Sequence, residues 1–327
     1  MCLARNIVFR LNARGQFQEF RDVGRIAVEA ARRLEDVGLL SVSLSNLGVA
    51  CWKLGHFEEG LEVATEARDV AVRLRDQHTE AHGESTIGLL LTVLGRHPEA
   101  LLHLERALAL ERELDIPRAE AETLTNLSTL YAQWGRCEEA ATAARRALEL
   151  HRTFEYRDNH VMALTDLAFA HLGLGEYEDA RVCLEEARAM CDSTSPPGDV
   201  ALALALSAEV DECLGRRSDA AGYARRALEL ARMSGSPTRQ AKVENLIGGF
   251  CRRRNEHERA LSLHAHAHEL ATAIQYRAES ARALHGMACA EEALGDTARA
   301  LEHRGAAAEL LDSMGCRAPR ADDRVRT

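Results

Sequence analysis

The sequence is poor in aromatic residues and lacks the features that mark secreted or membrane-spanning chains. Phenylalanine, tryptophan and tyrosine together make up 4% of the 327 residues, so large rings cannot fill most of a core. No apolar run approaches the roughly 20 residues that span a bilayer, and the first residues carry no signal-peptide pattern. These absences predict a cytoplasmic protein with no membrane partner.

Cysteine pairs and a positive charge excess are also missing. The nine cysteines are scattered, and no two of them form a Cys-x-x-Cys pair. Several fall on apolar helix faces, which favours buried free thiols in a reducing compartment over a disulfide framework. The formal net charge is −10, so the chain has no global positive field for nucleic acid or an anionic membrane.

A 40-residue repeat is the dominant feature of the sequence. Glycine returns in the same frame through seven of eight units, and alanine follows twelve residues later in all eight. The glycine frame is Gly15, Gly55, Gly95, Gly135, Gly175, Gly215, Asn255 and Gly295. Eight copies account for 320 of the 327 residues. A strict repeat of this length predicts an elongated array in which each unit packs mainly on its neighbours.

Each unit reads as two amphipathic helices. Leu124, Leu127 and Leu130 show the apolar i, i+3 spacing of the first helix, and acidic pairs such as Glu138-Glu139 open the second. Proline and glycine are expected to end the second helix of a unit, and the break at 193–198 is the expected site of a bend. The predicted fold is all-α, a solenoid over 1–315 with repeats at about 1–40, 41–80, 81–120, 121–160, 161–200, 201–240, 241–280 and 281–315, followed by a disordered tail at 316–327.

The repeat resembles the tetratricopeptide repeat, through Leu47-Gly48, Gly55, Phe57, Glu59 and Ala67. That resemblance implies paired antiparallel helices stacked into a right-handed superhelix with a concave groove. Units of 40 residues with Asn46-Leu47-Gly48 or Asn126-Leu127-Ser128 look like three groups: kinesin light chains, MalT-type regulators and the AfsR-type Streptomyces antibiotic regulatory proteins.

The stretch 283–288, Ala-Leu-His-Gly-Met-Ala, looks most like the actinobacterial AfsR-type group. The resemblance implies a non-catalytic sensor that binds a peptide or protein segment within a transcriptional regulator. That family also has a winged-helix domain and an NTP-binding module. Neither is present in this sequence, since every residue up to 315 belongs to a repeat.

In the tetratricopeptide architecture the first helix of each unit lines the groove, through its second, fifth, sixth, ninth, twelfth and thirteenth positions. Asparagine there could hold a peptide backbone, and arginine could pair with a carboxylate. The groove is expected to run from polar amide through acidic to basic; the alternative is an ordinary solvated face. The predicted groove residues are Asn46, His82, Glu122, Asn126, Thr129, Gln133, Met162, Asp166, Phe169, Glu209, Glu212, Lys242, Asn245, Arg252, Arg253, Arg282 and His285.

Metal, enzyme and nucleic-acid functions have weaker support. His257, His264 and His268, with His266 nearby, could ligate a metal, but leucines hold equivalent inter-helix positions in other repeats, so packing is favoured and no cofactor is predicted. The sequence has no phosphate loop, dinucleotide fingerprint, His-Glu-x-x-His or nucleophile elbow. The run 252–254 is basic but lacks interleaved aromatics, so direct nucleic-acid binding is not expected.

The first helix offers a second hypothesis. The segment Cys2–Leu11 is apolar over much of its circumference, whereas the terminal unit of a free-standing solenoid needs a polar outer face. An upstream domain or a second copy of the chain is therefore expected to cover it. In that alternative the protein is a self-associating scaffold or adaptor.

Overall fold

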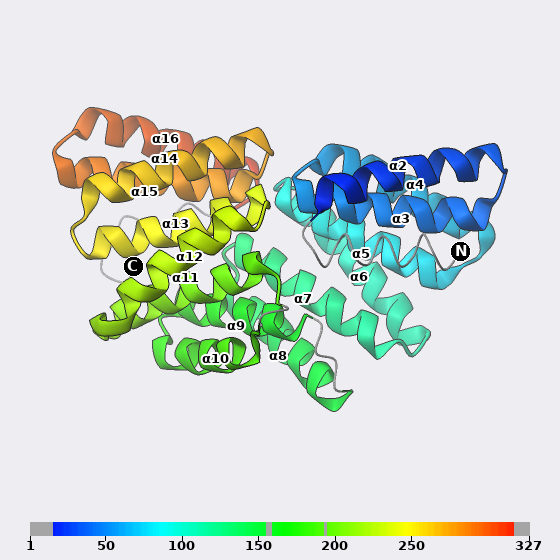
Figure 1. The fold of residues 1–327 in the computed structure, drawn as a ribbon, viewed down its shortest axis with the longest axis horizontal. Helices are drawn as coiled ribbons and strands as arrows, with labels where there is room; N and C mark the ends of the chain where they lie inside the picture. The colour runs from blue at the N-terminus through cyan, green and yellow to red at the C-terminus, as the bar shows by residue number, and fades with distance from the viewer. Residues whose placement is uncertain (1–15, 155–158, 193–194, 317–327) are drawn as a thin grey trace.

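The computed structural model describes residues 16–154, 159–192 and 195–316, and all regular structure in these ranges is α-helical. The fifteen helices of these described ranges follow one another as packed neighbours (Figure 1). The predicted apolar helix Cys2–Leu11 and the tail from residue 317 lie outside the described residues. Cys316 is buried, so the packed solenoid extends one residue beyond the predicted boundary.

The helices alternate between two positions in the repeat. The first helices are α3 (Val37–Leu54), α5 (Gln77–Val93), α7 (Pro117–Gln133), α9 (His160–Leu174), α11 (Pro197–Cys213), α13 (Pro237–Arg253) and α15 (Arg277–Leu294). The second helices are α2 (Phe17–Arg33), α4 (Phe57–Leu74), α6 (His97–Glu113), α8 (Cys137–Thr153), α10 (Tyr177–Met190), α12 (Arg217–Met233), α14 (His257–Ala273) and α16 (Thr297–Ser313).

A capping side chain or a proline sets the start of five first helices in the described part of the chain, α3, α5, α7, α11 and α13. Asp36 accepts a hydrogen bond from the Leu39 amide at 2.9 Å, which caps α3. Pro117 and Pro237 occupy the first turns of α7 and α13, where a missing N–H costs no intrahelical bond. The expectation that these prolines end the preceding helix is therefore wrong. The first helices also begin up to four residues before the predicted repeat boundaries.

The frame glycines mark left-handed turns between the two helices of a unit. Gly55 has φ of 81°, a conformation that residues with a Cβ adopt at a cost. Asn255 takes the same role with φ of 60°, and asparagine is the substitute that tolerates this region best. The single departure from the glycine frame therefore keeps the turn.

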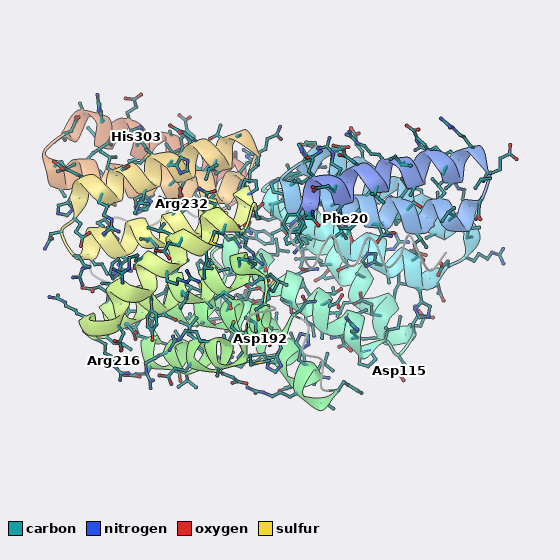
Figure 2. The ribbon with its side chains drawn as sticks, viewed as in Figure 1. Phe20, Asp115, Asp192, Arg216, Arg232 and His303 are labelled. Carbon is teal, nitrogen blue, oxygen red and sulfur yellow. The ribbon has the colours of Figure 1, made fainter. Side chains whose placement is uncertain are left out.

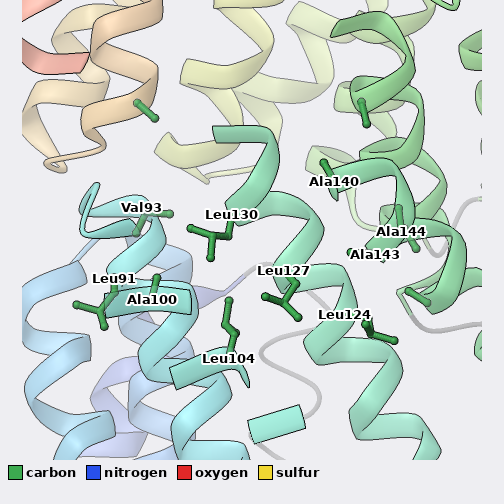
Figure 3. Packing of buried hydrophobic residues seen from close by; sticks show 14 of the residues in the cluster. Leu91, Val93, Ala100, Leu104, Leu124, Leu127, Leu130, Ala140, Ala143 and Ala144 are labelled. Carbon is green, nitrogen blue, oxygen red and sulfur yellow. The ribbon is translucent and has the colours of Figure 1, made fainter. Parts of the chain in front are cut away.

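Alanine and leucine build a core that is continuous from unit to unit. In Figure 3 the side chains of Leu91, Leu104, Leu127 and Ala140 line up across α5 to α8. Small alanines at the contacts let helix backbones approach closely, and the leucines fill the remaining space. This packing explains how a chain with so few aromatics buries its helices.

The solenoid curls until its first repeats meet its last (Figure 1). We call this contact the junction; it joins residues 52–57, 95–97 and 133–134 to residues 196–199, 236–239, 274–277 and 314–316. The turns at Asp115 and Arg216 lie at outer edges of the molecule, away from this contact (Figure 2).

Tyr276 is the central residue of the junction. Its ring meets Phe57 edge-on at 6.1 Å between centroids, and its hydroxyl accepts a hydrogen bond from Gln133 at 2.8 Å. Nearby, the Trp134 indole donates to the Gly315 carbonyl at 3.1 Å. The junction therefore brings together side chains that are 143 to 219 residues apart in the sequence.

Only α3, among the described helices, is long and apolar enough to cross a membrane by length and composition. In the structure it packs between α2 and α4 and also contacts α5 and α13. Its apolar character therefore has an explanation in packing, because core helices share this composition.

Candidate ligand-binding site

The inner surface of the solenoid contains a small central cavity of about 30 Å³. Five first helices, α7, α9, α11, α13 and α15, contribute its lining. Six of the predicted groove residues meet there: Thr129, Gln133, Asp166, Phe169, Lys242 and Arg282. Residues spread over 153 positions of the sequence thus surround one space.

A polar network holds the wall of this cavity in place. Thr129 donates to the Asp166 carboxylate at 2.9 Å, while Arg282 bonds to Glu279 and lies over the Phe169 ring at 5.1 Å. Lys242 has no carboxylate within 4 Å among the described residues; its ammonium lies 5.8 Å from the centroid of the Tyr276 ring. The cavity is therefore lined by both signs of charge, with one cation left without an ion pair.

Burial changes the proton affinities of these groups. It raises the pKa of Asp166 and lowers the pKa of Lys242, because both charged forms lose hydration. Burial alone would also raise the pKa of Glu279, but Arg282 and Lys242 outweigh it and hold that pKa below its usual value. The site is therefore a desolvated region in which a ligand's charge would be felt strongly.

The size of the cavity limits what it holds in this conformation. A space of about 30 Å³ accommodates about two water molecules. A peptide side chain or backbone segment enters only if side chains move or the junction opens. The central cavity in this conformation is thus too small for a peptide segment.

The acidic and basic stretches predicted for the groove neutralise one another. Glu209 of α11 forms an ion pair with Arg253 of α13, and Glu212 pairs with Arg254 at 3.0 Å and Arg217 at 3.3 Å. The two carboxylates are buried, at 5% and 7% exposure. A gradient from acidic to basic is therefore not what this inner surface presents.

The other predicted groove residues do not line the central cavity. Asn126 donates to the Ser85 hydroxyl at 3.2 Å, and Asn245 is buried and donates to Glu279 at 2.9 Å. Met162 accepts from Arg239 at 3.4 Å. Among the remainder, the half-buried residues are Asn46, Glu122 and Arg252, and the exposed ones are His82 and His285.

The histidines of α14 do not share a ligand position. His264 is buried between Gly248 and Gly286 and contacts Asn245 at 3.1 Å, whereas His268 pairs with the Ser280 hydroxyl at 3.0 Å. His257 is half-buried at the start of the helix, and His266 pairs with Glu244 at 2.6 Å. His264, His266 and His268 thus each contact a different side chain.

Sequence reasoning missed four inner-surface residues: Trp52, Lys53, Arg239 and Glu279. Trp52 and Lys53 occupy the twelfth and thirteenth positions of their unit, so the groove pattern contained them. Arg239 and Glu279 stand two residues before a predicted unit begins. Arg239 and Glu279 were missed because the first helices start earlier than the repeat frame implies.

The helix pairs and their stacking define a solenoid of the tetratricopeptide type. Tetratricopeptide-repeat family models match residues 79–153 and 161–193, so those segments carry such repeats. A search of curated proteins found no match.

Solved structures extend the likeness to most of the chain. A Rap protein complexed with Competence and Sporulation Factor has a TM-score of 0.70 at 13% identity, covering 96% of this chain and 98% of that one. NprR in complex with its cognate peptide NprX has a TM-score of 0.66 at 13% identity, with coverages of 94% and 86%. BtubC (BKLC) from P. vanneervenii reaches 0.55 at 23% identity, with coverages of 67% and 92%. At these identities the likeness establishes the fold.

Proposed function

We propose that the protein is a non-catalytic receptor that binds a peptide or an extended protein segment on its inner surface, around the central cavity. The observation that carries the proposal is the convergence of Thr129, Asp166, Phe169, Lys242 and Arg282 from four helices on one desolvated space. Concave surfaces are the usual binding face of repeat proteins. Two similar structures, the Rap and NprR complexes, hold a signalling factor or peptide.

Ligand binding and closure of the junction are coupled in this proposal. A segment in the interior contacts α7 and α9 on one side and α13 and α15 on the other, and the junction links α7 to the start of α15 through Gln133 and Tyr276. A ligand that fits the closed spacing stabilises closure, and one that needs more room opens it. In both cases the ligand shifts the balance between closed and open forms of the solenoid.

The wider setting in the proposal is a cytoplasmic sensor or interaction part of an actinobacterial transcriptional regulator. Its support is the resemblance of the 40-residue units and of residues 283–288 to that group. A second copy of the chain, or an upstream domain, would cover Cys2–Leu11. The support for that part is the apolar sequence of the segment alone.

Selection from a random peptide library displayed on phage tests the receptor function. We expect enriched peptides that bind the wild-type protein and lose at least tenfold in affinity with Phe169→Glu, which puts a charge into the cavity wall. Leu102→Glu is the matched control, because Leu102 lies on the second helix α6 and is 68% exposed. Peptides that bind both variants equally, with helicity unchanged, would show that the inner surface is not the receptor site.

A further inference from the structure

A second cavity, of about 50 Å³, lies in the junction and has a different character from the central one. Trp52 and Lys53 of α3 form one wall, and the first turns of α11 and α13 form the other. We call it the junction cavity. It therefore lies between the second repeat and the sixth and seventh repeats of the solenoid.

The charges around the junction cavity leave a positive excess. Lys53 and Arg239 contribute two cations, and Asp199 is the single carboxylate in the lining. Asp199 already pairs with Arg239 at 2.7 Å, and no carboxylate of the described residues lies within 4 Å of Lys53. The N-termini of α11 and α13 add the positive ends of two helix dipoles, each about half a charge.

Lys53 forms no ion pair with the described residues and lies instead beside aromatic rings. Its ammonium lies 4.7 Å from the centroid of the Trp52 ring and 5.9 Å from that of Phe17, and burial lowers its pKa. Lysine is otherwise nearly absent: the chain has two, Lys53 and Lys242, among its 41 basic residues. Both lie on the inner surface, and neither has a carboxylate of the described residues within 4 Å.

Two further hydrogen-bond donors line the same space without an acceptor. The Thr238 hydroxyl is buried, with its residue 6% exposed, and the Trp52 indole N–H is buried too. Neither has a partner among the described residues. Buried polar groups normally find one, so an acceptor that enters the cavity would satisfy both donors.

We propose that the junction cavity is an oxyanion site that takes a carboxylate or phosphoryl group between Lys53, Thr238 and the N-termini of α11 and α13. A space of about 50 Å³ has room for three to four water molecules, which matches a small oxyanion. The anion bridges α3 to α11 and α13, so it holds the first repeats against the later ones. The ligand class that fits is an acidic peptide or a phosphorylated small molecule.

The scarcity of lysine makes the test direct. Protein labelled with 13C at lysine Cε gives two side-chain NMR signals, which Lys53→Met and Lys242→Met assign. Sodium phosphate and sodium acetate are titrated separately at constant ionic strength set with chloride. We expect the Lys53 signal to shift saturably with at least one anion, while the Lys242 signal, as the internal control, moves little. Comparison of the two titrations shows whether phosphoryl or carboxylate oxygens are preferred.

Variants check that the bound anion uses this cavity. Thr238→Val should raise the dissociation constant of the anion about tenfold. Arg33→Met, which removes one positive charge from an 81% exposed side chain, should leave this constant unchanged. A Lys53 signal that does not move, or that moves in parallel with Lys242 without saturating, overturns the proposal. Because the probes are free anions, this failure is distinguishable from a failure of the peptide selection, which tests the inner surface as a whole.

Discussion

Glu111 provides the sharpest test of the buried polar contacts. It is a carboxyl group 1% exposed, and one oxygen accepts a hydrogen bond from Thr123 at 2.8 Å while the other has no partner among the described residues. Burial raises its pKa from 4.5 to about 7, against the opposing effect of the Thr123 hydrogen bond. Thr123 in turn contacts Ser85 at 2.8 Å, so the carboxyl ends a chain of hydrogen bonds between repeats.

The sign of the pH effect follows from the raised pKa. The folded state holds the Glu111 proton more tightly than the unfolded chain, so the group's contribution to stability falls as pH rises from about 4.5 to 7. At roughly 1.36 kcal/mol per pKa unit, the full cost above pH 7 is about 3 kcal/mol. Glutamine keeps the acceptor for Thr123 and cannot ionise, so Glu111→Gln removes this cost.

Urea denaturation followed by circular dichroism at pH 5 and pH 8.5 measures the difference. We expect Glu111→Gln to exceed the wild type at pH 8.5 by about 2.5 kcal/mol more than at pH 5, from the two pKa values and linkage. Glu113→Gln, on the exposed side of the same helix, is the matched control and should follow the wild-type profile. Equal pH profiles for wild type and Glu111→Gln would refute the argument.

Two further predictions concern packing and the junction. Gly248→Ala places a Cβ 2.6 Å from the His264 ring and should lower the free energy of unfolding by about 1–3 kcal/mol. Gly222→Ala, whose Cβ meets nothing within 4 Å, is the control and should raise the free energy of unfolding by up to about 1 kcal/mol. Equal effects of the two variants in urea denaturation would contradict the packing around His264. Tyr276→Phe removes the acceptor of the Gln133 amide and should cost about 1 kcal/mol, with faster amide exchange on both sides of the junction; unchanged exchange would show that the hydrogen bond does not hold the junction closed.

The repeat frame was enough to predict the helices and the turns between them. Period, helical spacing and turn glycines are local signals, so Gly55 and even the exception Asn255 could be interpreted without a structure. The sequence alone does not fix where each helix starts, because a proline such as Pro237 can end one helix or begin the next. In the structure Asp36 caps the start of α3, and Pro237 lies in the first turn of α13. Such a proline therefore begins the next helix.

The junction and the charge pairing could not be predicted from the sequence. Contacts such as Gly55 with Ile274 depend on the curvature accumulated over several repeats, and small changes in each unit add up. The pairing of Arg253 with Glu209 likewise depends on how α11 faces α13. The pattern of groove positions correctly selected Asp166 and Phe169, which meet at the central cavity. It did not predict which residues lie opposite them.

Photocrosslinking of a selected peptide tests the central claim most directly. A photoreactive benzoylphenylalanine replaces Phe169 at the central cavity in one protein and Leu102 on α6 in another, and mass spectrometry identifies the products. A receptor site on the inner surface predicts a covalent peptide adduct at position 169 that excess unlabelled peptide abolishes, and none at position 102. An adduct at position 102 with none at position 169 would place the ligand on the outer surface and contradict the account.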